Sequence, residues 1–445
     1  MIYLTNTLSG HKEPFIPLKS GNVRMYVCGP TVYDRAHLGN ARSAVVYDVL
    51  YRLLLAEYPK VTYVRNITDV DDKIIDKAMV TGQSMNAITE QMTAFYHQDL
   101  LALNCLPPTH EPRATEHISH IIAIIERLIE RRFAYVAEGH VLFSVSKFSQ
   151  YGALSKRSVD EMISGARIEP ASFKNNPADF VLWKPSTGEK ADYGFPSPWG
   201  WGRPGWHIEC SAMSRAYLGE SFDIHGGGAD LTFPHHENEI AQSTCAYEGS
   251  SYAQCWVHNG FLTVNGEKMS KSLGNFHIVR DVLQSGVEGA ALRYLYLTTH
   301  YRKPLDYSAK AISDAGKAVE KFRAAVGDEV ASDVPSEVMH FMRDDLNTPL
   351  ALAYMHKIAG EAHSGDVDKK RELAACAAFL GIALHKVIED VPQYILDLAE
   401  KREQCRVNKQ WRESDAIRGE IAACGYMVKD VSGGGYEVCK IPKSV

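Results

Sequence analysis

Apolar residues in the first part of the chain follow two alternating patterns. Short, mainly apolar runs rich in strand-favouring residues lie at 23–28 (VRMYVC) and 61–67 (VTYVRNI), and segments with helical periodicity follow them at 41–57 and 73–80. Short continuous apolar runs are typical of buried strands, whereas a spacing of three and four residues is typical of helices that pack on a core. The order strand, helix, strand, helix predicts an α/β fold with a doubly wound, Rossmann-like parallel sheet.

This pattern is interrupted between about residues 85 and 205. The stretch contains one helical segment at about 115–132, a hairpin-like segment (YVAEGHVLFSVS) and a run rich in Gly, Pro and Trp (YGFPSPWGWGRPGW). Two strand-like segments, SFDIHGGG and CWVHNGFLTV, then restore the α/β pattern. We therefore expect an insertion within the sheet domain.

Amphipathic helices account for the chain from about residue 308 almost to its end. They include AISDAGKAVEKFRAAV, PSEVMHFMRDDL and RELAACAAFLGIAL, and a helical pair with a small β-like tail follows them. The predicted parts are a split sheet domain, a connective insertion, a helical bundle domain and a small C-terminal domain, at 1–84 with 206–307, 85–205, 308–395 and 396–445.

The composition narrows the class of protein. Of 445 residues, 45% are hydrophobic and 23% are charged, as in globular proteins. No apolar run approaches about 18 residues and no charged-then-apolar leader opens the chain, so we expect neither membrane spans nor secretion. Nine scattered Cys indicate a reducing, cytoplasmic setting and leave some thiols for a metal. The net charge of −6 argues against a surface that is basic throughout.

Two segments carry residues suited to phosphate. In CGPTVYDRAHLGN, the residues His37, Gly39 and Asn40 lie at a strand-to-helix turn, where free N–H groups and the helix dipole favour an anion. In KMSKS, Lys268 and Lys271 follow an Asn-Gly turn, and a lysine on a loop can stabilise charge on a polyphosphate as it is cleaved. The alternatives are a plain βα turn with a surface His and an ordinary solvated loop.

A further segment, FPHHENEIAQ, offers metal ligands. His235 and Glu239 are four residues apart and share a helix face, whereas His236 points elsewhere, toward the core or the back of a ligand. A zinc-protease motif would need His at position 240, where the chain has Ile. Cys28 and Cys210 each end a strand-like segment, and the ends of parallel strands converge, so the four could form a mixed set for Zn²⁺. Cysteines that only fill the core are the alternative.

A glycine-rich stretch, HGGGADL, precedes this segment. Its three glycines would let a ligand approach the backbone, and Asp230 could bind a sugar hydroxyl. A simple glycine turn, with Asp230 as a cap, is the alternative.

Together these segments resemble the cysteinyl-tRNA synthetases, a family of class I aminoacyl-tRNA synthetases. HLGN is similar to the HIGH signature of that class, and KMSKS matches its second signature. The blocks YVCGPTVYD, RNITDVDDKI, WHIECSAMS, DIHGGGADLTFPHHENEIAQS and HNGFLTVNGEKMSKSLGN look like the family's own, in the family's order. The resemblance covers about residues 1–310, and DDLNTP extends it more loosely. The two signatures indicate only the class I synthetases, and the blocks that contain the Cys and His residues narrow the amino acid to cysteine.

The resemblance implies a role for each matching residue. The residues that would hold Zn²⁺ are Cys28, Cys210, His235 and Glu239. The residues that would hold ATP, together with Mg²⁺, are His37, Gly39, Asn40, Lys268 and Lys271, of which His37 and Lys271 would be catalytic. The residues that match the amino-acid pocket are Gly29, Thr68 and Trp206, and Asp230 is a further candidate for the ribose or adenine.

The implied reaction attaches L-cysteine to tRNA(Cys). The carboxylate of cysteine attacks the α-phosphorus of ATP and releases pyrophosphate, and the terminal ribose hydroxyl of the tRNA then accepts the cysteine. Zinc would select the thiol, because a thiol with a pKa of about 8.5 ionises on the metal far more readily than a serine hydroxyl. A pocket that reads shape alone separates such analogues by only about 1–3 kcal/mol. Four protein ligands usually close a zinc site. For the substrate thiol to bind the metal, it must therefore join as a fifth ligand, or one protein ligand must loosen. Glu239 is our candidate for the ligand that loosens.

Two departures and two alternatives accompany the resemblance. HLGN replaces the second His of the signature with Asn40, and the tail has Tyr436, with Trp411 earlier on a helix, where we expect a Trp near the end. Between 401 and 445, nine Lys and Arg stand against six Asp and Glu, which suits an anticodon-binding tail.

A cysteine ligase of thiol biosynthesis, which joins cysteine to a small amine, would lack that tail. A zinc-binding RNA module without catalysis would not need both phosphate segments. We expect a monomer.

Overall fold

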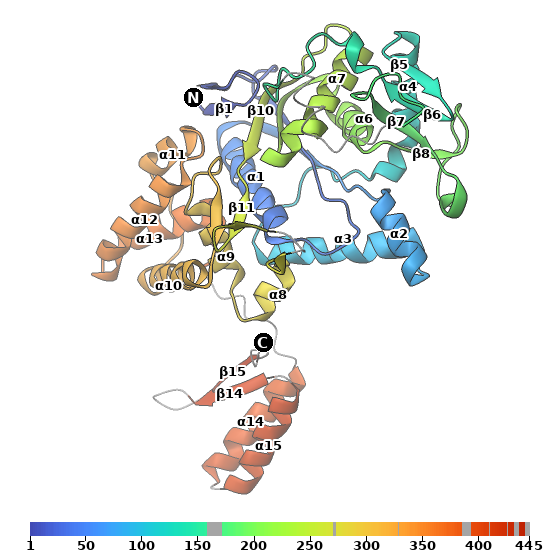
Figure 1. The fold of residues 1–445 in the computed structure, drawn as a ribbon. Helices are drawn as coiled ribbons and strands as arrows, with labels where there is room; N and C mark the ends of the chain where they lie inside the picture. The colour runs from blue at the N-terminus through green and yellow to red at the C-terminus, as the bar shows by residue number, and fades with distance from the viewer. Residues whose placement is uncertain are drawn as a thin grey trace.

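The computed structural model describes residues 1–157, 171–269, 273–327, 329–384, 393–408, 410–424, 426–430 and 436–440. Lys271, one of the residues predicted to bind ATP, lies outside the described residues. Figure 1 shows a large upper body, which contains the parallel sheet and most of the helices, and a small C-terminal unit below it.

A four-stranded parallel sheet lies at the centre of the large body. Its order is β10-β9-β3-β4, and each neighbouring pair is parallel. The strands are β3 (Asn22–Val27), β4 (Lys60–Arg65), β9 (Ser221–Gly228) and β10 (Tyr252–Asn259). All four coincide with strand-like segments of the sequence, so the prediction of a doubly wound parallel sheet is confirmed.

The connections of this sheet create a reversal point next to β3. Helix α1 (Leu38–Glu57) leads from β3 to β4 on one side, and the chain later returns to the other side of β3 as β9. In open α/β sheets, ligands bind outside the carboxyl ends of the strands at such a reversal. The residues that follow β3 and β9 are therefore placed where a site is expected.

Helix α1 packs into the main core through an almost continuous buried surface. Its residues Val45, Val49 and Leu53, four apart, are fully or almost fully buried. The same core includes residues of α3 (Met85–Ala102), in which Ile88 and Met92 are also four apart. Sequence reasoning named no helix at 85–102, although this spacing was present, so α3 is an addition to the predicted elements.

The insertion forms a second, antiparallel sheet with its own core. Its order is β5-β6-β7-β8, and it packs with α4 (Ile118–Glu130). The strands are β5 (Ala134–Ala137), β6 (His140–Phe143), β7 (Phe180–Pro185) and β8 (Gly202–Pro204). The predicted helix at about 115–132 and the predicted hairpin are both present.

The segment WHIEC is helical, so its interpretation as strand-like is wrong. It opens α6 (Trp206–Leu218), with Gly205 at the N-cap position after β8. Ile208 and Ala212 are four residues apart and both bury in the core of the insertion, which is the period of a helix and not of a strand. Cys210 therefore lies in the second turn of a helix instead of at the end of a strand.

Shorter elements complete the large body. A hairpin of β1 (Tyr3–Asn6) and β2 (His11–Pro14) begins the chain. A small sheet of order β12-β11-β13 follows β10, and the α-helices α8 and α9 lie in the described part of the chain between β12 and β13. These elements are β11 (Leu262–Val264), β12 (Glu267–Lys268), α8 (Val279–Gln284), α9 (Gly289–Leu297) and β13 (Leu305–Tyr307).

Helices dominate the rest of the chain, as the sequence indicates. The helical part consists of α10 (Ala309–Val326), α11 (Ser336–Arg343), α12 (Thr348–His363) and α13 (Val367–Phe379). The C-terminal unit consists of α14 (Gln393–Val407), α15 (Trp411–Ala423), β14 (Tyr426–Asp430) and β15 (Tyr436–Lys440), and it has a small core of its own. Among the described residues, no helix is long and apolar enough to cross a bilayer.

Candidate metal centre and nucleotide site

Four predicted metal ligands meet at the reversal point of the parallel sheet. Cys28 directly follows β3, and its backbone N–H donates to the carbonyl of Gly226 in β9, at 3.2 Å. Cys210 comes from α6, whereas His235 lies in a kinked segment, Thr232–His236, just before α7 (Glu237–Ala246). Glu239 lies in the first turn of α7. All four residues therefore come from the sheet domain, with Cys28 before the insertion in the chain and the other three after it.

The ligand atoms of these four residues lie within 4.8 Å of one another. Cys28 Sγ lies 3.8 Å from Cys210 Sγ and 3.5 Å from Glu239 Oε1. His235 Nε2 lies 3.1 Å from the same carboxylate oxygen. Cys210, His235 and Glu239 are buried, and Cys28 is half-buried. Two sulfurs, an imidazole nitrogen and a carboxylate oxygen are donors that Zn²⁺ accepts.

Two further observations fit a cation at this point. His235 Nε2 is buried and makes no well-aligned hydrogen bond within the described part of the chain, while its Nδ1 lies 2.8 Å from His207 Nδ1. A hydrogen bond from Cys28 lowers the pKa of the Cys210 thiol to about 6. Although burial opposes it, the neighbouring His225 and His235 lower the pKa of Glu239 to about 2. The cluster thus combines a carboxylate, two thiols and a buried imidazole nitrogen, and its residues fit a zinc ion.

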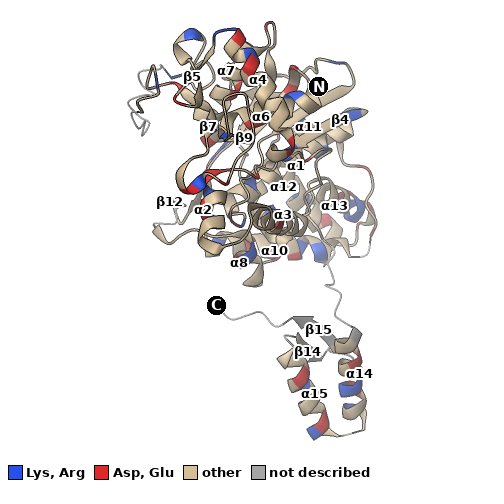
Figure 2. Cartoon of the chain, turned by 90° about the vertical axis from the view of Figure 1, so that its right-hand side faces the viewer, with Lys and Arg blue, Asp and Glu red and all other residues tan. Residues whose placement is uncertain are grey.

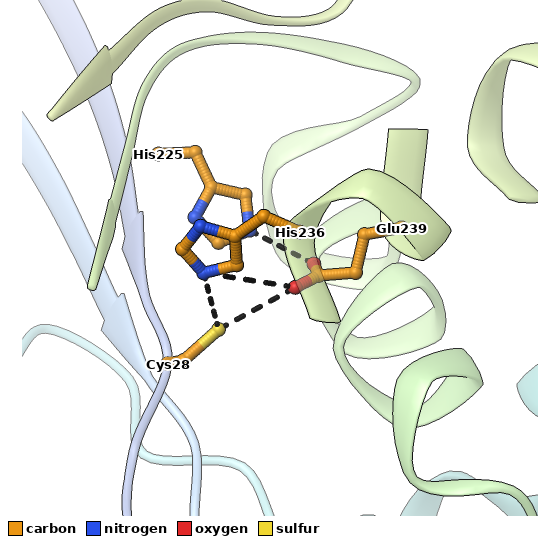
Figure 3. Close-up of side chains that lie close together, drawn as sticks. All are labelled: Cys28, His225, His236 and Glu239. Carbon is orange, nitrogen blue, oxygen red and sulfur yellow. Dashed lines mark hydrogen bonds and ion pairs between the residues drawn. The ribbon is translucent and has the colours of Figure 1, made fainter. Parts of the chain in front are cut away.

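A second group overlaps the first and shares Cys28 and Glu239 with it (Figure 3). His236 Nε2 lies 3.4 Å from Cys28 Sγ, and its Nδ1 lies 2.8 Å from His258 Nε2. His225 Nε2 lies 2.8 Å from Glu239 Oε2. His236, which the sequence assigned to the core or to the back of a ligand, therefore stands directly against a ligand. Sequence reasoning missed His225, although it lies in the block DIHGGG.

The glycines of HGGG make room for neighbouring side chains. A Cβ on Gly226 would lie 2.3 Å from the ring of Tyr47, and one on Gly227 would lie 2.7 Å from the ring of His236. This packing accounts for two of the glycines without a ligand. Asp230, in the short helical segment that follows, is exposed.

A hydrogen-bonded chain connects Gly29 and Thr68, two of the three residues predicted to bind cysteine. The Gly29 N–H donates to Asn66 Oδ1 at 2.9 Å, and Asn66 Nδ2 donates to Thr68 Oγ1 at 3.2 Å. Thr68 Oγ1 donates in turn to Glu209 Oε2 at 3.0 Å, and burial raises the pKa of Glu209 well above its ordinary value. Asn66 and Glu209 were not identified from the sequence.

A pocket of about 280 Å³ adjoins this chain. Its lining includes Trp206, His207 and Glu209. The ring of Trp206 stacks on that of His235 with centroids 4.1 Å apart, so one wall of the pocket also contacts the metal cluster. A small molecule in this pocket would contact Trp206 and Glu209 and residues that follow β4, such as Val70 and Asp71.

His37 caps the helix that follows it. Its Nδ1 accepts hydrogen bonds from the N–H groups of Gly39 and Asn40, at 3.1 and 3.2 Å, and Asn40 Oδ1 accepts from the His37 N–H at 3.3 Å. In this structure, two of the N–H groups expected to meet phosphate are thus paired with His37. Release of this cap would free them.

The two signature segments lie side by side. The Leu38 N–H donates to the His277 carbonyl at 3.1 Å, and the Val279 N–H donates to the Ala36 carbonyl at 2.9 Å. Residues that follow KMSKS therefore pair with the HLGN segment through their backbones. Lys268 ends β12 beside them; Lys271 falls outside the described residues, so its position is not assigned.

Comparisons with known proteins agree with this architecture. A family model described as "tRNA synthetases class I (C) catalytic domain" matches residues 14–317, and a DALR domain model matches residues 337–385. Cysteine–tRNA ligase of Paramagnetospirillum magneticum is 52% identical over 456 residues, with 97% of this chain and 98% of that protein covered. The ligase of Anaplasma phagocytophilum is 52% identical over 449 residues, with 96% and 97% covered.

Solved structures show the same fold at low sequence identity. Methionyl-tRNA synthetase of Mycobacterium tuberculosis, bound by methionyl-adenylate, matches with a TM-score of 0.57 and 15% identity, over 85% of this chain and 94% of that one. This likeness concerns the fold alone, whereas the matches at about half identity extend over nearly the whole sequence. The chain therefore belongs to the cysteine–tRNA ligase family of the class I tRNA synthetases.

Proposed function

We propose that this chain is a cysteine–tRNA ligase that uses zinc to recognise its amino acid. It activates L-cysteine with ATP, releases pyrophosphate, and transfers the cysteine to the 3′ end of tRNA(Cys). The observation that carries the zinc assignment is the buried cluster of Cys28, Cys210, His235 and Glu239, whose ligand atoms lie within 4.8 Å of one another beside an open pocket.

The cluster supports selection of cysteine over serine. When bound, zinc supplies a Lewis acid that favours a thiolate over a hydroxyl. The chain's own residues hold the amino acid beside it: Trp206 forms a wall of the pocket, and Thr68 is fixed by its bonds to Asn66 and Glu209. Because the hydroxyl of Thr68 has two protein partners, its orientation is set before a substrate binds. Such preorganisation favours the attacking geometry of a bound carboxylate.

Neither chemical step requires a nucleophile from the protein, because the substrate carboxylate and the tRNA hydroxyl attack in turn. The protein contributes positioning and charge stabilisation on the phosphates. For this role we propose His37, Gly39 and Asn40 from the first signature, and Lys268 and Lys271 from the second, with Mg²⁺ carried on ATP. The backbone pairing of Leu38 with His277 supports a shared site, because it holds the two segments together.

The C-terminal unit is the proposed anticodon-binding part. Figure 2 shows basic and acidic positions on both of its helices, α14 and α15. Trp411 at the start of α15 is 59% exposed, and the same helix carries Arg412 and Arg418. Exposed aromatic rings and cationic side chains suit binding to unpaired bases. A monomer and a cytoplasmic location remain our expectations.

Two assays on the same protein test this function. Cysteine-dependent exchange of labelled pyrophosphate into ATP measures activation, and charging of tRNA(Cys) measures transfer. We expect a chain that ends at residue 384 to keep exchange and to lose charging, because the sheet, the cluster and both signatures precede that point. Unchanged charging by the shortened chain would contradict the role of the C-terminal unit, and an absence of exchange in the folded, zinc-loaded full chain would contradict the proposed enzyme.

A further inference from the structure

The two carboxylate oxygens of Glu239 face different neighbours. Oε1 points into the ligand cluster, 3.1 Å from His235 Nε2 and 3.5 Å from Cys28 Sγ. Oε2 points away from it and accepts two hydrogen bonds, from Tyr252 Oη at 2.6 Å and from His225 Nε2 at 2.8 Å. Glu239 and His225 are fully buried, and Tyr252 is almost so. One oxygen is therefore directed to the cluster, while the other is held by donors on β9 and β10.

The two donors are themselves fixed in place. The Tyr252 hydroxyl lies 3.1 Å from Ser214 Oγ of α6, which is the helix that also supplies Cys210. The ring of His225 stacks on Trp256 with centroids 4.6 Å apart and an angle of 17° between the planes. His225 Nδ1 is buried without a hydrogen-bond partner among the described residues, so the Nε2 proton of a neutral ring is the one directed at Glu239. Figure 3 shows the His225 and Glu239 side chains joined in this way.

We propose that His225 and Tyr252 are positioning residues that restrict Glu239 to a one-oxygen metal ligand. A carboxylate can bind a metal through one oxygen or through both. Here a rotation that brought Oε2 to the metal would break two hydrogen bonds to a charged group, and such bonds are stronger than neutral ones. A coordination position that a two-oxygen Glu239 would occupy is thereby kept for the thiol of the substrate. The inference rests on the proposed zinc site.

This arrangement also bears on how the site admits a further ligand. Four protein ligands would close a zinc site unless one loosened or a fifth ligand joined. Because Oε2 is held by two buried donors, Glu239 is poorly suited to swing away. The restraint on Glu239 therefore favours addition of the substrate sulfur over release of the carboxylate.

Replacement of Tyr252 by Phe in the full-length chain tests the proposal. The variant keeps the ring and removes one donor to Oε2. We expect zinc to bind roughly 10–100-fold more weakly, as for other losses of a hydrogen bond to a metal ligand. Competition with a chromophoric chelator measures this affinity. We also expect the visible spectrum of the cobalt(II)-substituted protein to change before cysteine is added, because Oε2 then keeps only its bond from His225 and is less restrained. The spectrum should respond less when cysteine is added. Tyr63→Phe is the matched control, because the Tyr63 hydroxyl is buried with no hydrogen-bond partner among the described residues.

A pair of variants at His225 separates hydrogen bonding from packing. His225→Gln keeps an N–H donor, whereas His225→Leu removes it, so the first should retain more zinc affinity than the second. Equal affinity in these two variants, or wild-type affinity and an unchanged cobalt spectrum in folded Tyr252→Phe, would overturn the proposal. If the wild-type chain itself bound no zinc, the proposed metal site would fail instead, so the two failures are distinguishable.

Discussion

Replacement of Gly29 by alanine tests how tightly the loop after β3 packs against the segment that follows β4. Gly29 directly follows Cys28, which we propose as a zinc ligand, and an added Cβ would lie 1.6 Å from the backbone oxygen of Asn66 and 2.7 Å from its carbonyl carbon. Both atoms belong to the backbone, so no side-chain rotation relieves the overlap. The two segments must separate by more than about 1 Å to accept one methyl group.

The cost of this separation can be assembled from the contacts that it disturbs. Overpacking costs about 1–3 kcal/mol. The bonds from the Gly29 N–H to Asn66 Oδ1, 2.9 Å, and from the Thr68 N–H to the Pro30 carbonyl, 3.1 Å, would both stretch, at about 1 kcal/mol each. We expect a destabilisation of about 3–5 kcal/mol, a large share of the roughly 5–15 kcal/mol typical of whole proteins. Cys28 would shift with the loop, so zinc retention should fall as well.

Denaturant unfolding and metal analysis measure these two effects on one preparation. Gly360→Ala in α12 is the matched control, because a Cβ there meets no atom within 4 Å. Alanine is favoured over glycine inside a helix, so this control should be stabilised by up to about 1 kcal/mol. If Gly29→Ala unfolded within about 1 kcal/mol of the wild type and kept its zinc, the packing argument would be refuted.

Three other substitutions test separate parts of the molecule. Burial raises the pKa of Asp99 to about 6, so the wild type should gain stability as the pH falls from about 7 to 4. Asp99→Asn should remove that gain and stabilise the protein at pH 8 by up to about 3 kcal/mol. Urea unfolding at several pH values measures both effects. Arg293 is fully buried and bonds to Asp48, so Arg293→Met should cost about 3–5 kcal/mol, and an unchanged melting temperature would contradict this. Lys271→Ala should greatly slow pyrophosphate exchange with little change in the KM for cysteine, whereas an equal rate would refute its role on ATP.

The parallel sheet could be predicted because its strands are buried and read as short apolar runs. The helix α3 carried a comparable signal, with apolar residues four apart, but its many polar residues obscured it. WHIEC was misread because five residues are too few to distinguish a buried helix from a strand. Cys210 still lies next to Cys28, because α6 packs its second turn against the end of β3. The sequence predicted this contact for a different reason, the convergence of two strand ends.

The residues around the ligands could not be predicted, because they meet through tertiary contacts. Tyr252 lies 13 positions from Glu239, and His225 lies 14 positions from it, so no helical or strand period relates them. The cap made by His37 is a similar case. The sequence indicates a strand-to-helix turn with free N–H groups, but it does not show that the imidazole of the same turn pairs with two of them. His225, Tyr252 and this cap became visible only when distant segments were brought together.

Zinc content tests the central claim most directly. Metal analysis of the purified full-length chain should give about one zinc per chain, the occupancy of a single four-ligand site. Cys28→Ser and Cys210→Ser should each lose that zinc while Cys376→Ser, which changes a buried thiol outside the cluster, keeps it. A wild-type chain that exchanges pyrophosphate with cysteine but contains no zinc, or zinc that persists in both cluster variants, would contradict the account.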